Sequence, residues 1–260
     1  MLKNYFTVAW RNLLKSKAYS AINIIGLATG MAVAILIALW IWDELSFNDY
    51  HTNHRRLAQV MTTQTFNGQT GTGQAVALPL GKELRAKYGS DFKAVSMSSW
   101  NFGQILAIGD RKISTAGMSV EPVFPKMFSL RMLKGNINGL QDPSSILLSA
   151  SVAKALFGNQ DPLNKTVKVD NKTDLKVTGV YEDLPRNTTL YEMKILTAWD
   201  KYVASEPWIK NAITQWGNHS WQAFVQLNDH ADADKVSNKI KKASMIHLNA
   251  ATDGVEELIL

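Results

Sequence analysis

The sequence predicts an α+β domain outside the cytoplasm, with mixed strands and short helices, that is anchored by one N-terminal transmembrane helix. Residues 18–42 contain no charged side chain, which predicts the helix. With a mean hydropathy of −0.11, the chain as a whole is too polar for a bundle of membrane spans. Beyond residue 54 short hydrophobic runs alternate between helical and extended periods without a regular βαβ repeat, which predicts the α+β domain.

The uncharged stretch AYSAINIIGLATGMAVAILIALWIW is long enough to cross a bilayer. At 1.5 Å per residue, its apolar part from Ala21 to Trp42 spans roughly 33 Å, against about 30 Å of hydrocarbon. A buried core helix is the alternative, but core helices of this length usually carry a polar face. A cleaved signal peptide has a shorter apolar region and a small-residue cleavage site, whereas this stretch ends in bulky side chains. We therefore expect an uncleaved signal anchor at 18–42.

The charges around this span predict its direction. The first twenty residues carry four cations and no acid, whereas Asp43, Glu44 and Asp49 follow the other end. The positive-inside rule then places the N-terminus in the cytoplasm and residues 43–260 outside it. The remaining 240 residues hold 24 basic and 22 acidic side chains (28 − 4 and 22 − 0). The basic excess is therefore a membrane flank, and no nucleic-acid partner is expected. The flank consists of Lys3, Arg11, Lys15 and Lys17.

Residues 1–17 have the pattern of an amphipathic helix lying in the cytoplasmic headgroup region. An unstructured basic tail is the alternative, because the segment is short. The apolar side chains that share one helical face are Leu2, Phe6, Ala9, Trp10 and Leu13.

Small residues recur at every fourth position of the span and form a smooth stripe on one side of the helix. Such stripes let two transmembrane backbones approach closely, so we expect this face to pack against another helix. Small residues are also common on lipid-facing helices, so the alternative is that the stripe faces lipid and contacts no other helix. Its members are Gly26, Gly30, Ala34 and Ala38.

Beyond the span, local signals predict short elements. Strands are expected at 57–66, 92–97, 112–120, 191–196 and 221–227, and short helices after Pro79 and at 122–128. The stretch 68–73 is expected to be a flexible hairpin tip or loop. A last helix over 232–247 is expected to bury Val236, Ile240 and Ala243.

Residues 145–183 give the clearest local prediction. A strand at 146–148 is followed by a helix capped by Ser149 or Ser151 and ended by Gly158. Two strands, at 166–169 and 175–181, then form a hairpin around Asp170-Asn171.

The sequence carries little that indicates catalysis or a cofactor. There is no cysteine, which excludes thiolate catalysis and sulfur-ligated metal sites. Phosphate-binding loops, nucleophile elbows and zinc-protease motifs are absent too. Asp49, His51 and His54 lie close together, but we interpret them as part of a polar juxtamembrane helix. We expect no catalytic residue, no metal and no cofactor.

Two blocks of sequence resemble the MacB/FtsX-type ABC transporter permeases. The first is FTVAWRNLLKSKAYSAINIIGLATGMAVAILIALWIWDELSFNDYH, which is similar to the start of such a permease. The second is SILLSASVAKALFGNQDPLNKTVKVDNKTDLKVTGVYEDLPRNTTL, which is similar to the periplasmic core domain. Leu163-Asn164-Lys165 departs from a common glycine before the lysine.

The resemblance implies a cytoplasmic elbow helix at 1–17, a transmembrane helix at 18–42 and a MacB-like periplasmic core domain at 43–260 with two subdomains. It also implies a permease in the bacterial inner membrane that couples ATP hydrolysis by a separate ABC subunit to movement of the periplasmic domain. The implied substrates are peptides, lipoproteins or similar molecules. Besides the ATP-binding subunit and membrane lipid, the implied partners are a second permease copy or repeat half and a periplasmic or outer-membrane protein.

Two other classes of function remain open. One is a single-span extracytoplasmic sensor or binding module; the other, a tethered hydrolase, lacks a visible nucleophile–base pair. The apolar run at 255–260 has no evident end, so we expect the chain to continue, and further spans would distinguish a permease from a sensor.

Overall fold

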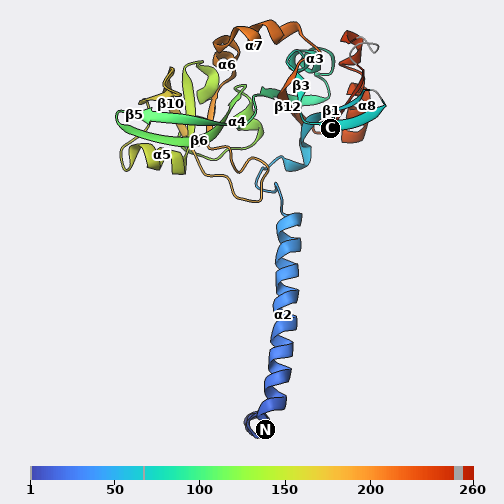
Figure 1. Cartoon of the computed structure of the whole chain (residues 1–260), viewed down its shortest axis with the longest axis vertical. Coiled ribbons are helices and arrows are strands. Elements are labelled where there is room, and N and C mark those ends of the chain that lie inside the picture. Colours follow the sequence, from blue (N-terminus) through green and yellow to red (C-terminus); the bar gives the residue numbers. More distant parts are fainter. Residues whose placement is uncertain (1, 67, 249–253) are drawn as a thin grey trace. The chain divides into compact units, whose positions relative to one another are not determined.

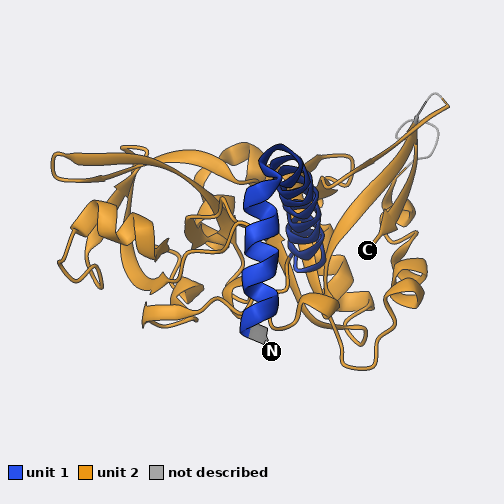
Figure 2. Ribbon diagram, turned by 90° about the horizontal axis from the view of Figure 1, so that it is seen from below, with its two compact units in different colours: residues 1–47 blue, residues 48–260 orange. Residues whose placement is uncertain are grey.

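The structure is a computed structural model that describes residues 2–66, 68–248 and 254–260. The chain divides into two compact units, residues 1–47 and residues 48–260 (Figure 2).

The first unit consists of two helices, α1 (Leu2–Lys15) and α2 (Lys17–Leu45). The expected helix at 1–17 is thus helical over most of its length, although the side chain of Leu2 lies outside the described residues. By length and composition, α2 is suited to cross a membrane. It includes the expected span 18–42 and continues three residues beyond it, so the predicted boundary at 42/43 falls inside the helix.

The second unit is a mixed α+β domain (Figure 1), as predicted. Its strands follow the hydrogen-bonded order β11-β8-β10-β9-β5-β6-β4-β12-β1-β13, with β2 on β1, β3 on β12 and β7 on β10. The strands are β1 (Leu57–Phe66), β2 (Gln69–Gly73), β3 (Val76–Ala77), β4 (Phe92–Ser98), β5 (Phe102–Ile108), β6 (Arg111–Val120), β7 (Met132–Gly135), β8 (Ser145–Ser149), β9 (Thr166–Val169), β10 (Thr173–Tyr181), β11 (Ile195–Ala198), β12 (His219–Leu227) and β13 (Val255–Ile259).

The strands form two lobes within this unit. In the second lobe, which comprises β5 to β11, β11 also pairs with β6, so the path from β6 to β11 closes into a ring. The first lobe is formed by β1 to β4, β12 and β13. Between β4 and β6 the ladder consists of one residue pair, Ser98 with Val120. The lobes are therefore joined mainly by side-chain packing.

Short helices cover the lobes and connect them. In Figure 1, α6 and α7 cross from the side that carries β6 and β10 to the side that carries α3 and β12. The helices of this unit are α3 (Leu80–Lys87), α4 (Phe124–Met127), α5 (Ala150–Phe157), α6 (Trp199–Ser205), α7 (Pro207–Asn211) and α8 (Ala233–Ile240), with short 3₁₀ turns η1 (His54–Arg56), η2 (Gly139–Gln141), η3 (Ala212–Thr214) and η4 (Met245–His247).

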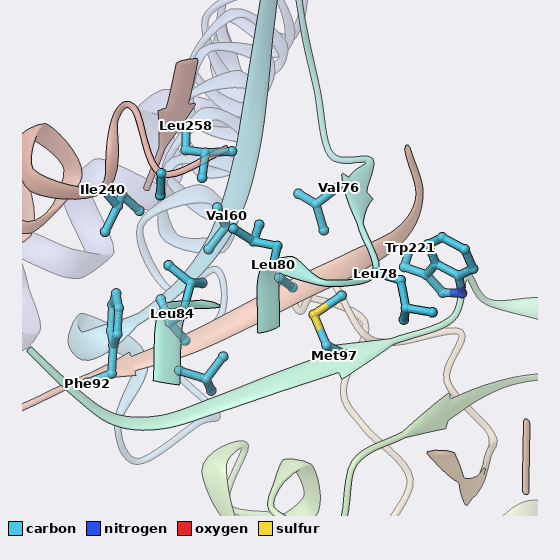
Figure 3. Packing of buried hydrophobic residues seen from close by; sticks show 14 of the residues in the cluster. Val60, Val76, Leu78, Leu80, Leu84, Phe92, Met97, Trp221, Ile240 and Leu258 are labelled. Atoms are coloured by element: carbon cyan, nitrogen blue, oxygen red, sulfur yellow. The ribbon is translucent and has the colours of Figure 1, made fainter. Parts of the chain in front are cut away.

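In the described part of the chain, buried hydrophobic side chains form three clusters. One fills the first lobe, where Val60, Leu84, Met97 and Trp221 pack together (Figure 3), and another fills the ring between β5, β8, β10 and α5. The third, here called the junction cluster, takes Phe124, Phe128 and Leu190 from the second lobe and Phe224 from β12 of the first. The resemblance implies two subdomains. The two lobes share this cluster, and together they form one compact unit, residues 48–260.

Local chemistry explains the best-predicted segment. Ser149 caps α5 by accepting a hydrogen bond from the Val152 amide, and Gly158 ends the helix at a φ of 62°. The Asp183 carboxylate accepts from the Ser151 amide (2.8 Å) and hydroxyl (2.6 Å). Burial raises the pKa of Asp183, but these hydrogen bonds and the Lys194 ammonium outweigh it, so the pKa is lowered. The aspartate of the D-L-P motif therefore stabilises the start of α5.

The hairpin at 166–181 forms as predicted. Asp170 and Asn171 both have positive φ, 50° and 56°, as a tight turn between paired strands requires.

Other predictions were wrong in detail. Residues 68–73 belong to a hairpin, one of the two alternatives expected, but residues 69–73 are its second strand, β2, paired with β1, and not its tip. The last helix ends at Ile240, followed by a turn and η4. The strand expected at 191–196 begins at Ile195. The apolar run at 255–260 forms β13 against β1 and buries Leu258. Strands β3, β5 and β7 and helices α6 and α7 were not predicted.

Candidate functional site

The candidate site is the joint segment, residues 48–56, through which the chain enters the domain after α2. Sequence analysis predicted a polar helix here, and that prediction was wrong. Residues 46–53 are mainly turns, and helical structure in the segment is limited to the 3₁₀ turn η1. Asn48 has a φ of 65°, a left-handed conformation that asparagine tolerates and that no α-helix contains.

Three hydrogen bonds fasten Asn48 to the loop that follows the D-L-P motif. Its amide donates to the Asn187 carbonyl (2.8 Å), and its side-chain nitrogen donates to Thr189 Oγ1 (3.0 Å). Its side-chain oxygen accepts from the Thr189 amide (2.9 Å). Both ends of the Asn48 carboxamide are thus engaged, which fixes the first residue of the domain against the second lobe.

His51 fastens the segment a second time, deeper in the domain. The side chain is 2% exposed. Its Nδ1 donates to the Phe128 carbonyl (2.7 Å), and its Nε2 accepts from the Thr188 hydroxyl (3.1 Å). A carbonyl can only accept, so this pairing fits the neutral imidazole with the proton on Nδ1.

Aromatic contacts connect the joint segment with side chains of both lobes. The His51 ring meets Tyr50 and Phe128 edge-on, with centroids 5.4 and 5.2 Å apart. Phe128 in turn meets Phe224 of β12 at 5.4 Å. Tyr50 and Leu57 pack on the junction cluster. A displacement of the joint segment therefore acts on the cluster that both lobes share.

The electrostatics favour a neutral His51. Burial lowers its pKa below the ordinary 6.5 and the neighbouring His54 adds to this, while the hydrogen bond to Phe128 opposes it. His54 itself lies 3.3 Å from Asp49, and Arg56 pairs with Asp229. The three side chains that suggested a metal cluster are thus engaged otherwise, and no group suited to hold a metal ion occurs among the described residues.

The site residues expected from the sequence lie on the two helices of the first unit. Lys3, Arg11 and Lys15 are exposed on α1, and Lys17 begins α2. The stripe residues Gly26, Gly30, Ala34 and Ala38 lie on α2 and are exposed. A Cβ built on either glycine meets no atom within 4 Å, so the stripe is uncovered in this chain and its packing role remains a prediction.

Sequence reasoning missed the joint itself. His51 was weighed only as a metal ligand or as part of a polar helix. Asn48 was not singled out, and Asn187-Thr188-Thr189 were part only of the second resembling block. Their contacts join residues 137 to 141 positions apart, and no local pattern reports such contacts. An asparagine between turn-like residues just after a membrane helix is the available signal.

Comparison with protein families identifies the class of protein. The profile described as the MacB-like periplasmic core domain matches residues 20–243. The chain therefore belongs to this family, which confirms the resemblance. Comparison with curated proteins gave no match.

Solved structures share the fold. A domain of a protein described as a permease from Porphyromonas gingivalis superposes with a TM-score of 0.67 at 19% identity, covering 80% of this chain and 90% of that one. The periplasmic region of MacB from Actinobacillus actinomycetemcomitans gives 0.53 at 18%, covering 72% and 84%. The extracellular domain of the noncanonic ABC-type transporter YknZ from Gram-positive bacteria gives 0.52 at 13%, covering 78% and 100%. At these identities the likeness concerns the fold.

The His51 geometry predicts a loss of stability in acid. Because the pKa of His51 is lowered in the folded chain, the neutral ring stabilises the fold above pH 6.5, and this contribution is lost as the pH falls through the lowered pKa. His51→Asn should cost about 1–3 kcal/mol at neutral pH and should reduce the loss of stability between neutral pH and about pH 5. Thermal unfolding measured across this range checks both effects.

The matched control is His230→Asn, which replaces an exposed histidine. It should leave both the stability at neutral pH and the acid loss unchanged. An acid loss as large in His51→Asn as in the wild type would contradict the assignment.

Proposed function

We propose that this chain is a permease subunit of an ABC transporter of the MacB/FtsX type. ATP hydrolysis by a separate ATP-binding subunit moves the membrane helices, and the periplasmic domain transmits this movement to peptides, lipoproteins or similar substrates. The chain's role is mechanical, and chemistry resides in the partner. Membership of the MacB-like family supports the transporter class.

The observation that carries the proposal is the double fastening of the joint segment. Two residues separate the end of α2 at Leu45 from Asn48, and from there Asn48 and His51 bind the second lobe. A short link followed by a buried anchor passes displacement to the domain, whereas a passive tether needs only a flexible linker. The junction cluster behind the anchor is shared by both lobes, so the movement reaches each of them.

The charge pattern supports the orientation that we propose. The four cations of α1 and the start of α2 lie on the cytoplasmic side of the bacterial inner membrane, and residues 48–260 lie in the periplasm. The apolar side chains of α1, including Phe6, Trp10 and Leu13, are exposed, as expected of a helix that rests on lipid.

The transmission of movement from α2 to the domain can be tested by making the link before Asn48 longer and more flexible. Because the chain has no cysteine, spin labels attached at Lys82→Cys on α3 and Ser114→Cys on β6 report the distance between the lobes. In the complex with the ATP-binding subunit, this distance should change with ATP. Inserting two glycines between Phe47 and Asn48 should abolish the change, because the link no longer transmits force.

The control is the same insertion between Gly109 and Asp110, in the turn between β5 and β6. It lengthens the chain away from the joint and should preserve the ATP response. A response that survives the insertion at the joint would refute transmission through this segment.

The orientation predicts a labelling pattern in spheroplasts. A membrane-impermeant maleimide should modify Ser114→Cys without permeabilisation, and should modify Asn12→Cys only after it. Both positions are exposed, so a difference reports sidedness rather than burial. The opposite pattern would place the domain in the cytoplasm and exclude the proposed role.

The stripe on α2 predicts a packed interface with a second permease copy or repeat half. Gly30→Leu should weaken association, because close backbone contact supplies the attraction between helices in hydrocarbon, and it should not impair insertion, since leucine is more apolar. Cross-linking of single cysteines introduced along α2 measures the contact face.

Ala32→Leu is the control, because two residues along a helix place the introduced leucine on nearly the opposite side. It should leave the cross-linking pattern intact. Cross-links spread evenly around the helix would mean that the stripe faces lipid.

A further inference from the structure

Strand β2 forms an edge of the sheet. One of its sides pairs with β1, and among the described residues no strand pairs with its other side. All of its residues are exposed. A sheet edge presents unpaired backbone N–H and C=O groups, and native proteins usually protect such an edge with charged side chains, proline, a bulge or a covering element.

Strand β2 has none of these forms of protection. Residues 57–81 contain no charged side chain, and the proline in this stretch, Pro79, lies beyond the strand. The pairing of β2 with β1 runs from one end to the other without a bulge. A Cβ built on Gly71 or Gly73 meets no atom within 4 Å, so no described element covers the strand there. The edge is therefore open and uncharged, which is typical of a strand that pairs with another chain.

The hydrogen bonds of β13 show which way the backbone of β1 is directed. The Leu258 amide donates to the Lys241 carbonyl (2.9 Å), so the backbone groups of Leu258 face away from β1. Backbone groups of successive strand residues are directed to opposite sides, and Glu257 therefore faces β1. Because Glu257 lies opposite Thr63, the backbone groups of Thr63 face β13.

The free backbone groups of β2 follow from this orientation. Thr72 lies opposite Thr63 on the other side of β1. Because the backbone groups of Thr63 face β13, this pair exchanges no backbone hydrogen bond, and those of Thr72 face away from β1. Thr70 faces the same way, whereas Gly71 between them faces β1. The open edge therefore offers the N–H and C=O groups of Thr70 and Thr72.

This edge is complementary to itself. When two copies of β2 run antiparallel about a two-fold axis at Gly71, Thr70 of each copy lies opposite Thr72 of the other. Each of these two pairs can exchange two backbone hydrogen bonds. A shift of the register by one residue aligns no such pair within β2, and a shift by two residues aligns only one. The positions of the free groups therefore select a single register.

The side chains are compatible with the same register. Thr63 Oγ1 lies 2.9 Å from Thr72 Oγ1, and Thr65 Oγ1 lies 2.8 Å from Thr70 Oγ1. The two-fold axis brings Thr70 of one copy beside Thr72 of the other, which continues this row of threonines across the contact, and cross-strand threonine pairs stabilise sheets. Gly71 has no side chain at the axis, and the absence of charge avoids repulsion between identical strands.

We propose that β2 pairs with β2 of a second copy of this chain, so that the two domains share one continuous sheet. A single pair of short strands is far smaller than a standard interface of about 1,600 Å². The contact therefore forms between copies anchored in the same membrane, where their effective concentration is high. It lies on a different surface from the stripe on α2, goes beyond the proposed transport role and requires no ATP-binding subunit.

Single cysteines test the register in the full chain, purified and reconstituted into lipid vesicles. At the axis, Gly71 of one copy lies opposite Gly71 of the other in a pair without hydrogen bonds, with Cα atoms about 4.5 Å apart. This distance is within reach of a disulfide. Mild oxidation of Gly71→Cys should therefore give a disulfide-linked dimer, measured by non-reducing electrophoresis.

Gly73→Cys is the matched control, because it lies on the same strand and is equally open. In the proposed register its counterpart in the other copy is roughly 14 Å away, too far for a disulfide, so it should remain monomeric. Mixing this variant with Gln69→Cys, which lies opposite it across the axis, should restore the cross-link. Equal cross-linking of Gly71→Cys and Gly73→Cys, or none in either, would overturn the contact.

Thr72→Pro, added to Gly71→Cys, tests the backbone pairing. It removes an N–H group that faces away from β1, so the ladder within the chain is retained, whereas pairing with a second copy should be lost together with the disulfide. Thermal unfolding checks that this variant folds, and a cross-link that survives in the folded variant would overturn the pairing. The comparison of Gly71→Cys with Gly73→Cys needs no proline and decides the register by itself.

A second experiment identifies the occupant in cell membranes. A benzophenone attached to Gly71→Cys should link the chain to a second copy of itself on irradiation. Linkage to a different protein, and not to a second copy, would overturn the proposed occupant. Because the vesicles contain no ATP-binding subunit, failure of the disulfide test would leave the proposed transport role standing.

Discussion

The structure depends on one buried, neutral imidazole. His51 lies inside a hydrophobic cluster, where a polar ring is costly unless both nitrogens are paired. The Phe128 carbonyl and the Thr188 hydroxyl meet that requirement, and both belong to the second lobe. The ring can therefore be buried only when the joint segment is docked, and docking completes the cluster that holds the lobes together.

This constraint matters because the backbone contributes little at the junction. Between β4 and β6 the ladder has one residue pair, whereas the ring of the second lobe closes on itself through β11 and β6. A bidentate ion pair between Arg85 of α3 and Glu121, at 2.8 and 3.1 Å, adds a polar contact across the same boundary. Each lobe is thus held by its own ladders, and the boundary by side chains. Side-chain contacts at such a boundary rearrange more readily than strand ladders, as the proposed transmission of movement through the domain requires.

The sequence predicted what local chemistry determines. Ser149, Gly158 and the Asp170-Asn171 turn act on their own backbone or on residues a few positions away, and all three were correctly placed. The unbroken apolar run likewise predicted α2.

Contacts between distant segments could not be predicted from local sequence in this way. The stretch that forms β2 was expected to be a hairpin tip or a loop, because glycines such as Gly71 and Gly73 give no strand pattern, yet its pairing with β1 makes it a strand. The role of His51 depends on a carbonyl 77 residues away, so the local sequence suggested only a metal ligand or part of a polar juxtamembrane helix. The order of elbow helix, transmembrane helix and periplasmic core domain was predicted from the family resemblance, because hydrophobic periodicity predicts single elements and not their arrangement.

The segments on the two sides of the joint differ in whether their contacts are made within the chain. On the domain side, the polar groups of Asn48 and His51 find partners within the chain itself, so the anchor is complete without another subunit. On the helix side, the described part of α2 buries no residue, and the face formed by Gly26 and Gly30 is open. Bulky side chains bury more apolar surface in a tether, and glycine inside a helix costs about 1 kcal/mol relative to alanine. Two glycines on one face of a membrane helix are what the predicted contact with a neighbouring helix requires, because small residues let two backbones approach. In the transporter that we propose, the movement that reaches the joint segment would begin at such a helix contact, outside the domain.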